Sequence, residues 1–172
     1  TSNLKAHEQD VLLRCLMGTR TDIANPSVST KVSYSLIKGQ LPSFTLYIKK
    51  DHTVFIGIGA TVNSGKFDIK GSDVGSITWD GEFMCMLKAG TSSLTVDAEP
   101  LDTTVTVDAN TNVLFDEGAY VEFVNLAGVK DNNGNQGYKI TDITGDVITV
   151  SPALVASAPI GSIIQGFIPF TD

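Results

Sequence analysis

The two histidines are the residues from which a catalytic or metal site would most readily be built. His7 falls in a helical pattern, and His52 lies in the turn signal Lys50-Asp51-His52. Neither histidine is near a serine or cysteine in a nucleophile-elbow context, and two histidines do not supply the three ligands of a catalytic zinc site. We therefore expect both histidines to be solvated or packed side chains without a catalytic role.

The two cysteines, Cys15 and Cys85, are far apart in the sequence. They belong to no CxxC motif and to no cysteine–histidine pair, which are the usual signs of redox or metal chemistry. Free cysteines behave as small apolar side chains. We therefore expect two buried thiols rather than a disulfide or a pair of metal ligands.

A glycine pair and an amide-rich loop share features with ligand-binding motifs. Gly57-Ile58-Gly59-Ala60 lacks the third glycine and the following helix that a dinucleotide site needs. Asp131–Asn135 has oxygen-bearing side chains at alternate positions, and Asp142 follows eleven residues after Asp131. However, Gln136 stands where a calcium loop requires glycine, and strand patterns flank the loop. We therefore expect a polar hairpin loop and no dinucleotide site.

The remaining candidates are acidic pairs and aromatic residues. The acidic pairs are Asp97/Glu99 and Asp116/Glu117, which have no neighbour in the sequence that would polarise them, so they are expected to be solvated turns. Trp79, Phe83 and Phe67 could form a platform for a sugar, but their alternation places them more naturally in a core. We therefore predict no catalytic, cofactor-binding or metal residues, no cofactor, and a protein that is not an enzyme.

One helix and a series of strands are predicted to carry these residues. Side chains four residues apart indicate a helix from Leu4 to Met17, with Ser2 or Asn3 as its cap and Gly18 after its end. Beyond Gly18 the period changes to two, which indicates strands. These strands are expected at residues 31–36, 44–49, 53–58, 66–70 and 76–87.

Two glycine-containing segments set the expected turns of this first part. Asn63-Ser64-Gly65 is predicted to be a turn between two strands. Asp80-Gly81 allows either a tight hairpin or a glycine bulge inside one long strand from Ser76 to Leu87. Because apolar residues continue on both sides of it, the pattern favours the bulge.

A second part begins near Asp97 and consists of shorter strands. We expect them at residues 103–107, 113–115, 119–124, 137–143, 147–150 and 162–168. Short strands at this spacing are typical of a small closed or nearly closed β-barrel. The predicted fold is thus mainly β: a β-sandwich or barrel core with one N-terminal flanking helix in residues 1–96, and a small β-barrel-like module in residues 97–172.

The composition excludes some classes of function. Nineteen acidic and twelve basic side chains give a net charge of −7, and only 18% of the 172 residues are charged. A protein that neutralises phosphates needs a basic face, so specific nucleic-acid binding is not expected. The longest apolar stretches are far short of the ~20 residues that cross a bilayer, so no membrane partner is expected. Strands with few charges at their edges are templates for pairing with another chain.

Several stretches resemble the tail tube proteins, or major tail proteins, of tailed bacteriophages. The first three are Leu41–Lys50, Gly59–Ile69 with its Gly-Ala-Thr-Val-Asn element, and Val74–Phe83 with its Trp79-Asp80-Gly81 step. Four later stretches resemble small β modules inserted in such subunits: Phe115–Val121, Asn133–Ile140, Ile148–Leu154 and Ala158–Gly161. The resemblance spans about Leu41 to Pro169.

The resemblance implies a β-sandwich or barrel tube core and a structural function in the virion. Members of this family join their sheets into rings, usually hexamers, and the rings stack into a conduit through which DNA passes without specific binding. Leu41–Lys49 and Ser76–Leu87 would then be tube-sheet strands, and Val113–Ile168 a module on the outside. The net charge of −7 suits a wall that must not retain DNA.

The expected partners are copies of the chain itself and other tail proteins, such as the tape measure and terminator proteins. The expected location is the virion tail, and the host cytoplasm during assembly. The family's long ring-to-ring loop and full N-terminal region are not obvious, and a further strand would be expected beyond Phe170. We therefore expect the chain to be a truncated or central fragment.

Two other functions remain open from the sequence. The chain could be a glycan- or protein-binding β module of a phage or bacterial surface structure, with an exposed aromatic and carboxylate cluster around Trp79 or Tyr138. It could also be an enzyme with a dispersed site, for which a deep pocket lined by His52 and several carboxylates would be required.

Overall fold

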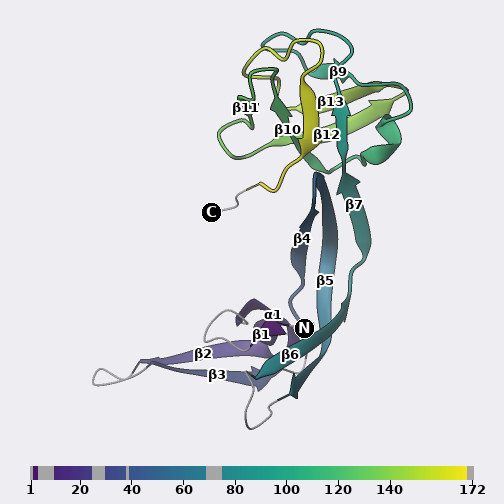
Figure 1. Cartoon of the computed structure of the whole chain (residues 1–172). Coiled ribbons are helices and arrows are strands. Elements are labelled where there is room, and N and C mark those ends of the chain that lie inside the picture. The colour runs from purple at the N-terminus through teal and green to yellow at the C-terminus, as the bar shows by residue number, and fades with distance from the viewer. Residues whose placement is uncertain (1, 4–9, 25–29, 38, 69–74, 170–172) are drawn as a thin grey trace. The chain divides into compact units, whose positions relative to one another are not determined.

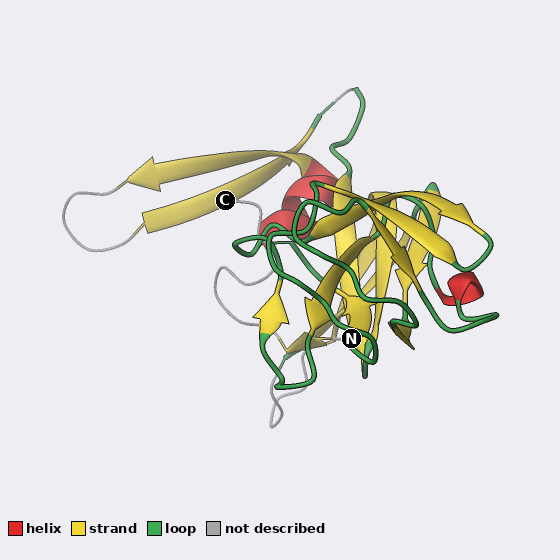
Figure 2. Ribbon diagram, turned by 90° about the horizontal axis from the view of Figure 1, so that it is seen from above, coloured by secondary structure: helices red, strands yellow, loops and turns green. Residues whose placement is uncertain are grey.

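The computed structural model describes residues 2–3, 10–24, 30–37, 39–68 and 75–169 (Figure 1). The fold is mainly β, as predicted, and Figure 2 shows how little of the described chain is helical. The helical elements of the described residues are α1 (Asp10–Met17) and a short 3-10 helix, η1 (Asn112–Leu114). The strands are β1 (Ser2–Asn3), β2 (Gly18–Ala24), β3 (Thr30–Leu36), β4 (Phe44–Lys50), β5 (Thr53–Asp68), β6 (Ser76–Glu82), β7 (Cys85–Ala89), β8 (Thr91–Ser93), β9 (Thr104–Thr106), β10 (Tyr120–Val124), β11 (Lys130–Asp131), β12 (Tyr138–Thr144), β13 (Val147–Ser151) and β14 (Ile163–Gly166).

The chain divides into two compact units. The first unit consists of Thr1–Thr45 and Ile58–Cys85, and the second of Leu46–Gly57 and Met86–Asp172. This division differs from the predicted boundary between residues 96 and 97. The turn end of the β4–β5 hairpin belongs to the second unit because Val54 and Ile56 are part of its buried core. Strand β5 therefore starts in one unit and ends in the other.

The first unit begins with the helix and a long hairpin. Helix α1 is described from Asp10, and the predicted turns of this helix at residues 4–9 lie outside the described residues. Gly18 directly follows the helix with a φ of +96°, which L-residues rarely adopt, so the predicted helix end is confirmed. Ser2 and Asn3, the predicted caps, form β1 and pair with Ile77 and Ser76 of β6; residues 4–9 lie outside the described residues, so the cap stays a prediction.

Strand β5 is one continuous strand of 16 residues, so the predicted turn at Asn63-Ser64-Gly65 was wrong. The β5–β6 register shifts between Val62 and Ser64, and this irregularity takes up Asn63 without ending the strand. The Trp79 ring on β6 occupies the space that a side chain at position 65 would need. The strand therefore requires a glycine there.

Asp80-Gly81 lies inside β6, paired with β5, so it does not form a hairpin. A Cβ atom at Gly81 would overlap the carbonyl oxygen of Thr61, and this close approach of two backbones explains the glycine. The long strand predicted from Ser76 to Leu87 is interrupted at Phe83 and Met84, and β7 follows as a separate strand that also pairs with β5.

The second unit contains an antiparallel sheet with the strand order β8-β14-β10-β12-β13-β9, and β11 pairs with β10. The sheet is not a closed barrel, because its first and last strands, β8 and β9, do not pair with each other. The residues that follow them nevertheless meet at one bridge, Leu94–Val107. The predicted strand at 113–115 was wrong: Asn112–Leu114 form the 3-10 helix, and only Phe115 bridges to Ala89.

The core of the second unit is built from alternate residues of its strands. On β12 and β13 the buried side chains lie two residues apart, as the period of a strand requires, whereas on β10 Val121, Glu122 and Phe123 are all buried. The largest fully buried ones include Phe123, Tyr138, Ile140, Ile148 and Ile164. Phe123 and Tyr138 pack edge to face with ring centroids 5.3 Å apart. This core makes the second unit a folded body with its own hydrophobic interior.

Candidate functional site

The residues considered for catalysis do not converge on a site in the described parts of the chain. His52 is exposed in the β4–β5 turn, and its carbonyl oxygen accepts a hydrogen bond from the Thr91 hydroxyl at 3.1 Å. His7 lies outside the described residues. Gly57 and Gly59 lie within β5, so the strand–turn–helix geometry of a dinucleotide site is not formed around them.

The Asp131–Asn135 loop uses its oxygen atoms to hold its own backbone. The Asp131 carboxylate accepts hydrogen bonds from the backbone N–H groups of Asn133 at 3.2 Å and Ala156 at 3.1 Å. The Asn132 side-chain oxygen accepts one from the backbone N–H of Asn135 at 3.1 Å. Among the residues that the structure describes, no three His, Cys, Asp or Glu side chains are grouped as a metal site would require.

Two of the acidic residues predicted to lie in solvated turns, Asp97, which is exposed, and Asp116, which is half-buried, also hold loops in place. Asp97 accepts a hydrogen bond from the backbone N–H of Ile160 at 2.6 Å, and Asp116 accepts one from that of Lys88 at 2.8 Å. Both bonds join segments that are distant in the sequence, so sequence neighbours alone could not reveal them. They stabilise loops of the second unit and leave these carboxylates poorly placed for acid–base chemistry.

The cysteines and aromatic residues also differ from the predictions. Cys15 is buried, but Cys85 is exposed and both are free thiols. Tyr138, expected at an exposed binding face, has an exposed fraction of 0%, and its hydroxyl oxygen accepts a hydrogen bond from the Val155 N–H at 3.0 Å. Burial raises the pKa of this hydroxyl to about 12. Trp79, the other residue named for such a face, is half-buried with its ring beside Gly65.

The first unit exposes apolar side chains that the alternation pattern assigned to a core. Phe67 is 52% exposed, Phe83 is 47% exposed and Met84 is 89% exposed. Phe83 and Met84 also line a hollow of about 550 Å³ together with Leu41 and Gly59. We call Phe67, Phe83 and Met84 the apolar set of the first unit. Phe83 and Met84, which are adjacent in the sequence and line the same hollow, are the part of this set that lies together, and contiguous exposed apolar side chains commonly mark a site of protein–protein contact.

The β2–β3 hairpin supplies unpaired strand edges in the same unit (Figure 1). Its register runs from Gly18 opposite Leu36 to Ala24 opposite Thr30, and the described residues contribute no third strand to this sheet. The base of the hairpin is held by Asp10, whose carboxylate accepts hydrogen bonds at 2.6 Å from both Tyr34 and Arg20. The Tyr34 hydroxyl, and then Arg20, hold the pKa of the Asp10 carboxyl below its usual value.

The sheet of the second unit, in contrast, has its two end strands joined to each other. The N–H of Thr95 donates to the carbonyl oxygen of Thr106 at 2.9 Å, and the N–H of Asp108 donates to that of Ser93 at 3.0 Å. These bonds occupy backbone groups that an open edge would present to another chain. The second unit therefore has less edge available for strand pairing than the β2–β3 hairpin.

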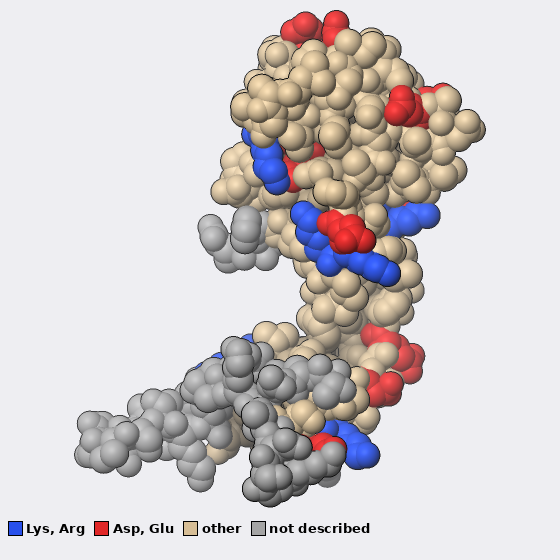
Figure 3. Space-filling model, viewed as in Figure 1, with Lys and Arg blue, Asp and Glu red and all other residues tan. Residues whose placement is uncertain are grey.

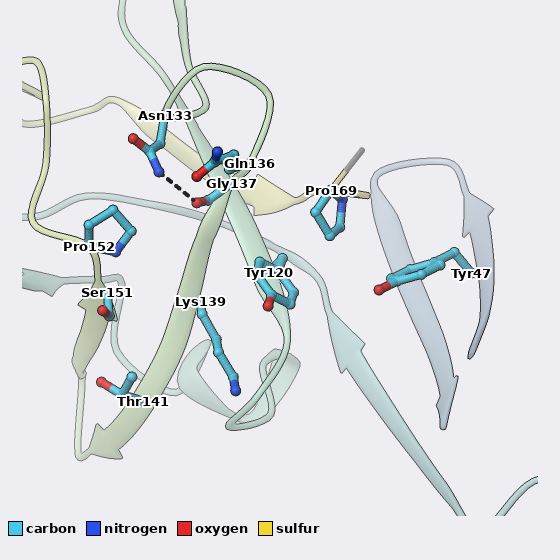
Figure 4. A pocket seen from close by; sticks show the side chains of 10 residues that line it. All are labelled: Tyr47, Tyr120, Asn133, Gln136, Gly137, Lys139, Thr141, Ser151, Pro152 and Pro169. Carbon is cyan, nitrogen blue, oxygen red and sulfur yellow. Dashed lines mark hydrogen bonds between the residues drawn. The ribbon is translucent and has the colours of Figure 1, made fainter. Parts of the chain in front are cut away.

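The second unit does contain a hollow of about 520 Å³, shown in Figure 4. Tyr47 contributes from β4 and Tyr120 from β10, and both are half-buried. Lys139 and Ser151 project from β12 and β13, and Gln136 lies in the loop before β12. We call this the tyrosine hollow. The strand pattern alone did not reveal it, because its residues come from five separate segments.

Comparison of the chain with protein-family models, with curated protein sequences and with solved structures gave no match. Within the described residues, no helix has the length and apolar character needed to cross a membrane. Figure 3 shows small, separated groups of charged side chains on the face of the second unit in view, with uncharged surface between them.

Proposed function

We propose that the chain is a structural subunit of the tail tube type that associates with copies of itself into rings and a conduit for DNA. The observation that supports this most directly is the β2–β3 hairpin, a two-stranded sheet with edges that no described strand covers. Such edges pair readily with a strand of another chain. The apolar set of the first unit would add surface that becomes buried in the same contacts.

In this proposal the two units have different roles. The first unit, with β6 and the part of β5 from Ile58 onward, provides the tube sheet. The predicted tube strands Leu41–Lys49 and Ser76–Leu87 belong to it up to Thr45 and Cys85, and their last residues belong to the second unit. The second unit, with its own core and joined sheet ends, is a module carried on the outside. A ring of six copies would multiply the net charge of −7, and a like-charged wall would let DNA pass without adhering. The tape measure and terminator proteins would be its further partners.

This proposal is tested by measuring self-association of the unchanged chain and of a variant that carries a charge in the apolar set. Sedimentation and electron microscopy over a range of protein concentrations should show oligomers and rings. Phe83→Glu should shift association to at least about tenfold higher concentration, because burying a carboxylate in an apolar contact is unfavourable. Val155→Glu is the matched control, since Val155 is also exposed but lies in the second unit.

Each outcome of this experiment has a clear meaning. Concentration-dependent oligomers that Phe83→Glu weakens and Val155→Glu leaves unchanged would support the tube assignment. Monomers at every concentration would contradict it. Oligomers that both substitutions weaken equally would contradict the separate roles of the two units.

A further inference from the structure

The tyrosine hollow carries an inference that goes beyond self-association. We propose that it is a binding site for an acidic saccharide, a pyranose with a carboxylate group. The hollow is lined by two tyrosine rings, amide and hydroxyl side chains and one lysine, and no carboxylate lines it. Its volume of about 520 Å³ lies within the range of small-molecule sites.

The two tyrosines give the hollow apolar walls with polar tips. Tyr47 packs partly against the core of the second unit, which fixes its ring in place. Burial, and then the nearby Tyr120, raise the pKa of the Tyr47 hydroxyl, so this ring stays neutral at physiological pH. Rigid tyrosine rings supply contact area at small entropic cost. The C–H faces of a pyranose are suited to such rings, while its hydroxyls can reach the tyrosine O–H groups.

The polar side chains of the hollow are available to a ligand. The hydroxyls of Tyr47, Tyr120 and Ser151 and the amide of Gln136 have no hydrogen-bond partner among the described residues. Two other lining side chains already have partners: the Asn133 amide donates to the carbonyl oxygen of Gly137 at 3.5 Å, and the Thr141 hydroxyl donates to that of Thr149 at 3.3 Å. Free donors and acceptors on several sides of a hollow match the many hydroxyl groups of a sugar, each of which both donates and accepts.

Charge favours an acidic sugar over a neutral one. Lys139 is the charged residue of the lining, and no described carboxylate forms an ion pair with it. In a chain with a net charge of −7, a hollow with one ammonium group and no acid is a local exception. One lysine is enough to bind a single carboxylate by a charge-assisted hydrogen bond, but it is too few to hold a nucleic-acid backbone.

A glycan array of uronic- and sialic-acid glycans and their neutral counterparts tests this inference with the whole chain. We expect acidic glycans among the hits, and titration calorimetry with a galacturonate trisaccharide and with maltotriose would measure the preference. Tyr120→Ala should remove binding, and Lys139→Gln should weaken binding of the acidic sugar about tenfold at low salt. Lys66→Gln, an equal charge change on β5 in the first unit, is the control.

The outcomes separate this inference from the tube assignment. An array without hits, or hits that Tyr120→Ala and Lys139→Gln leave unchanged, would overturn the saccharide site. Equal affinity for acidic and neutral sugars would overturn the role given to Lys139. None of these results depends on ring formation, so the saccharide site and self-association can fail independently. Thermal unfolding of each variant establishes that the second unit remains folded.

Discussion

Replacing Tyr138 with phenylalanine gives the sharpest test of the second unit's core. Tyr138→Phe keeps the ring against Phe123 but removes the oxygen that accepts the Val155 N–H at 3.0 Å. A hydrogen bond of this kind contributes about 1 kcal/mol to stability. At pH 7 the variant should therefore have a free energy of unfolding about 1 kcal/mol lower than that of the unchanged protein.

The difference should shrink as the pH rises, because burial raises the pKa of Tyr138 to about 12, above the value of about 10 that is usual for tyrosine. Above pH 10 the unfolded chain loses the tyrosine proton while the folded chain retains it. The stability that the neutral hydroxyl contributes is present below pH 10 and is lost as the pH approaches 12. At pH 11 this loss is about 1.4 kcal/mol, which phenylalanine does not suffer.

Urea unfolding of the two proteins from pH 7 to pH 11 would measure this convergence. We expect the two free energies of unfolding to become about equal near pH 11. Tyr120→Phe is the control, since it removes a tyrosine hydroxyl that bonds to no described residue. A constant difference between Tyr138→Phe and the unchanged protein across the whole pH range would refute the assignment of a buried, hydrogen-bonded hydroxyl.

Three other substitutions test packing elsewhere. In a urea titration, Gly81→Ala should lower the free energy of unfolding by roughly 1–3 kcal/mol, because its Cβ would overlap the Thr61 carbonyl oxygen. Gly39→Ala is the control and should change this free energy little, because Gly39 has open space around it. Val54→Ala should lower the stability of the second unit by about 2 kcal/mol, visible as faster amide exchange in β10 and β12; exchange unchanged there would place Val54 outside that core. A double-mutant cycle of Glu122→Gln and Lys130→Met should give a coupling free energy of about 1 kcal/mol. The Lys130 ammonium lies 2.9 Å from the buried Glu122 carboxylate, but the lysine side chain is itself half exposed. Additive effects of the two substitutions would contradict this ion pair.

The strand pattern predicted the positions of the strands of the second unit well. It predicted poorly which face of β4 is buried. Alternation located β10, β12 and β13 to within about two residues, because each has one face in a core. On β4 the apolar row includes Leu46 and Ile48, yet these are exposed and Tyr47 is the residue that packs against the core. A period of two identifies two faces, but it cannot tell which face a second segment of the chain will cover.

Long-range contacts were the other part that the sequence could not supply. The turn signal Asn63-Ser64-Gly65 was overridden because β6 pairs along the whole segment and Trp79 fills the space above Gly65. Tyr47 lines the tyrosine hollow because residues 46–57 of the β4–β5 hairpin belong to the second unit. No local sequence pattern predicts this membership. Local patterns therefore predict where strands occur. Pairing with a distant strand determines whether a segment such as Asn63-Ser64-Gly65 forms a turn or continues a strand.

The residues at which pattern and exposure disagree support the proposed self-association. Phe67 and Phe83 follow an alternation typical of core positions, but they are exposed in the single chain. Large apolar side chains that follow the alternation of a strand are usually buried in the functional state. If that state is the assembled tube, a copy of the chain supplies the cover. The disagreement then identifies interface residues, which is why Phe83→Glu, rather than a substitution in the second unit, is the variant that decides between a tube subunit and an autonomous module.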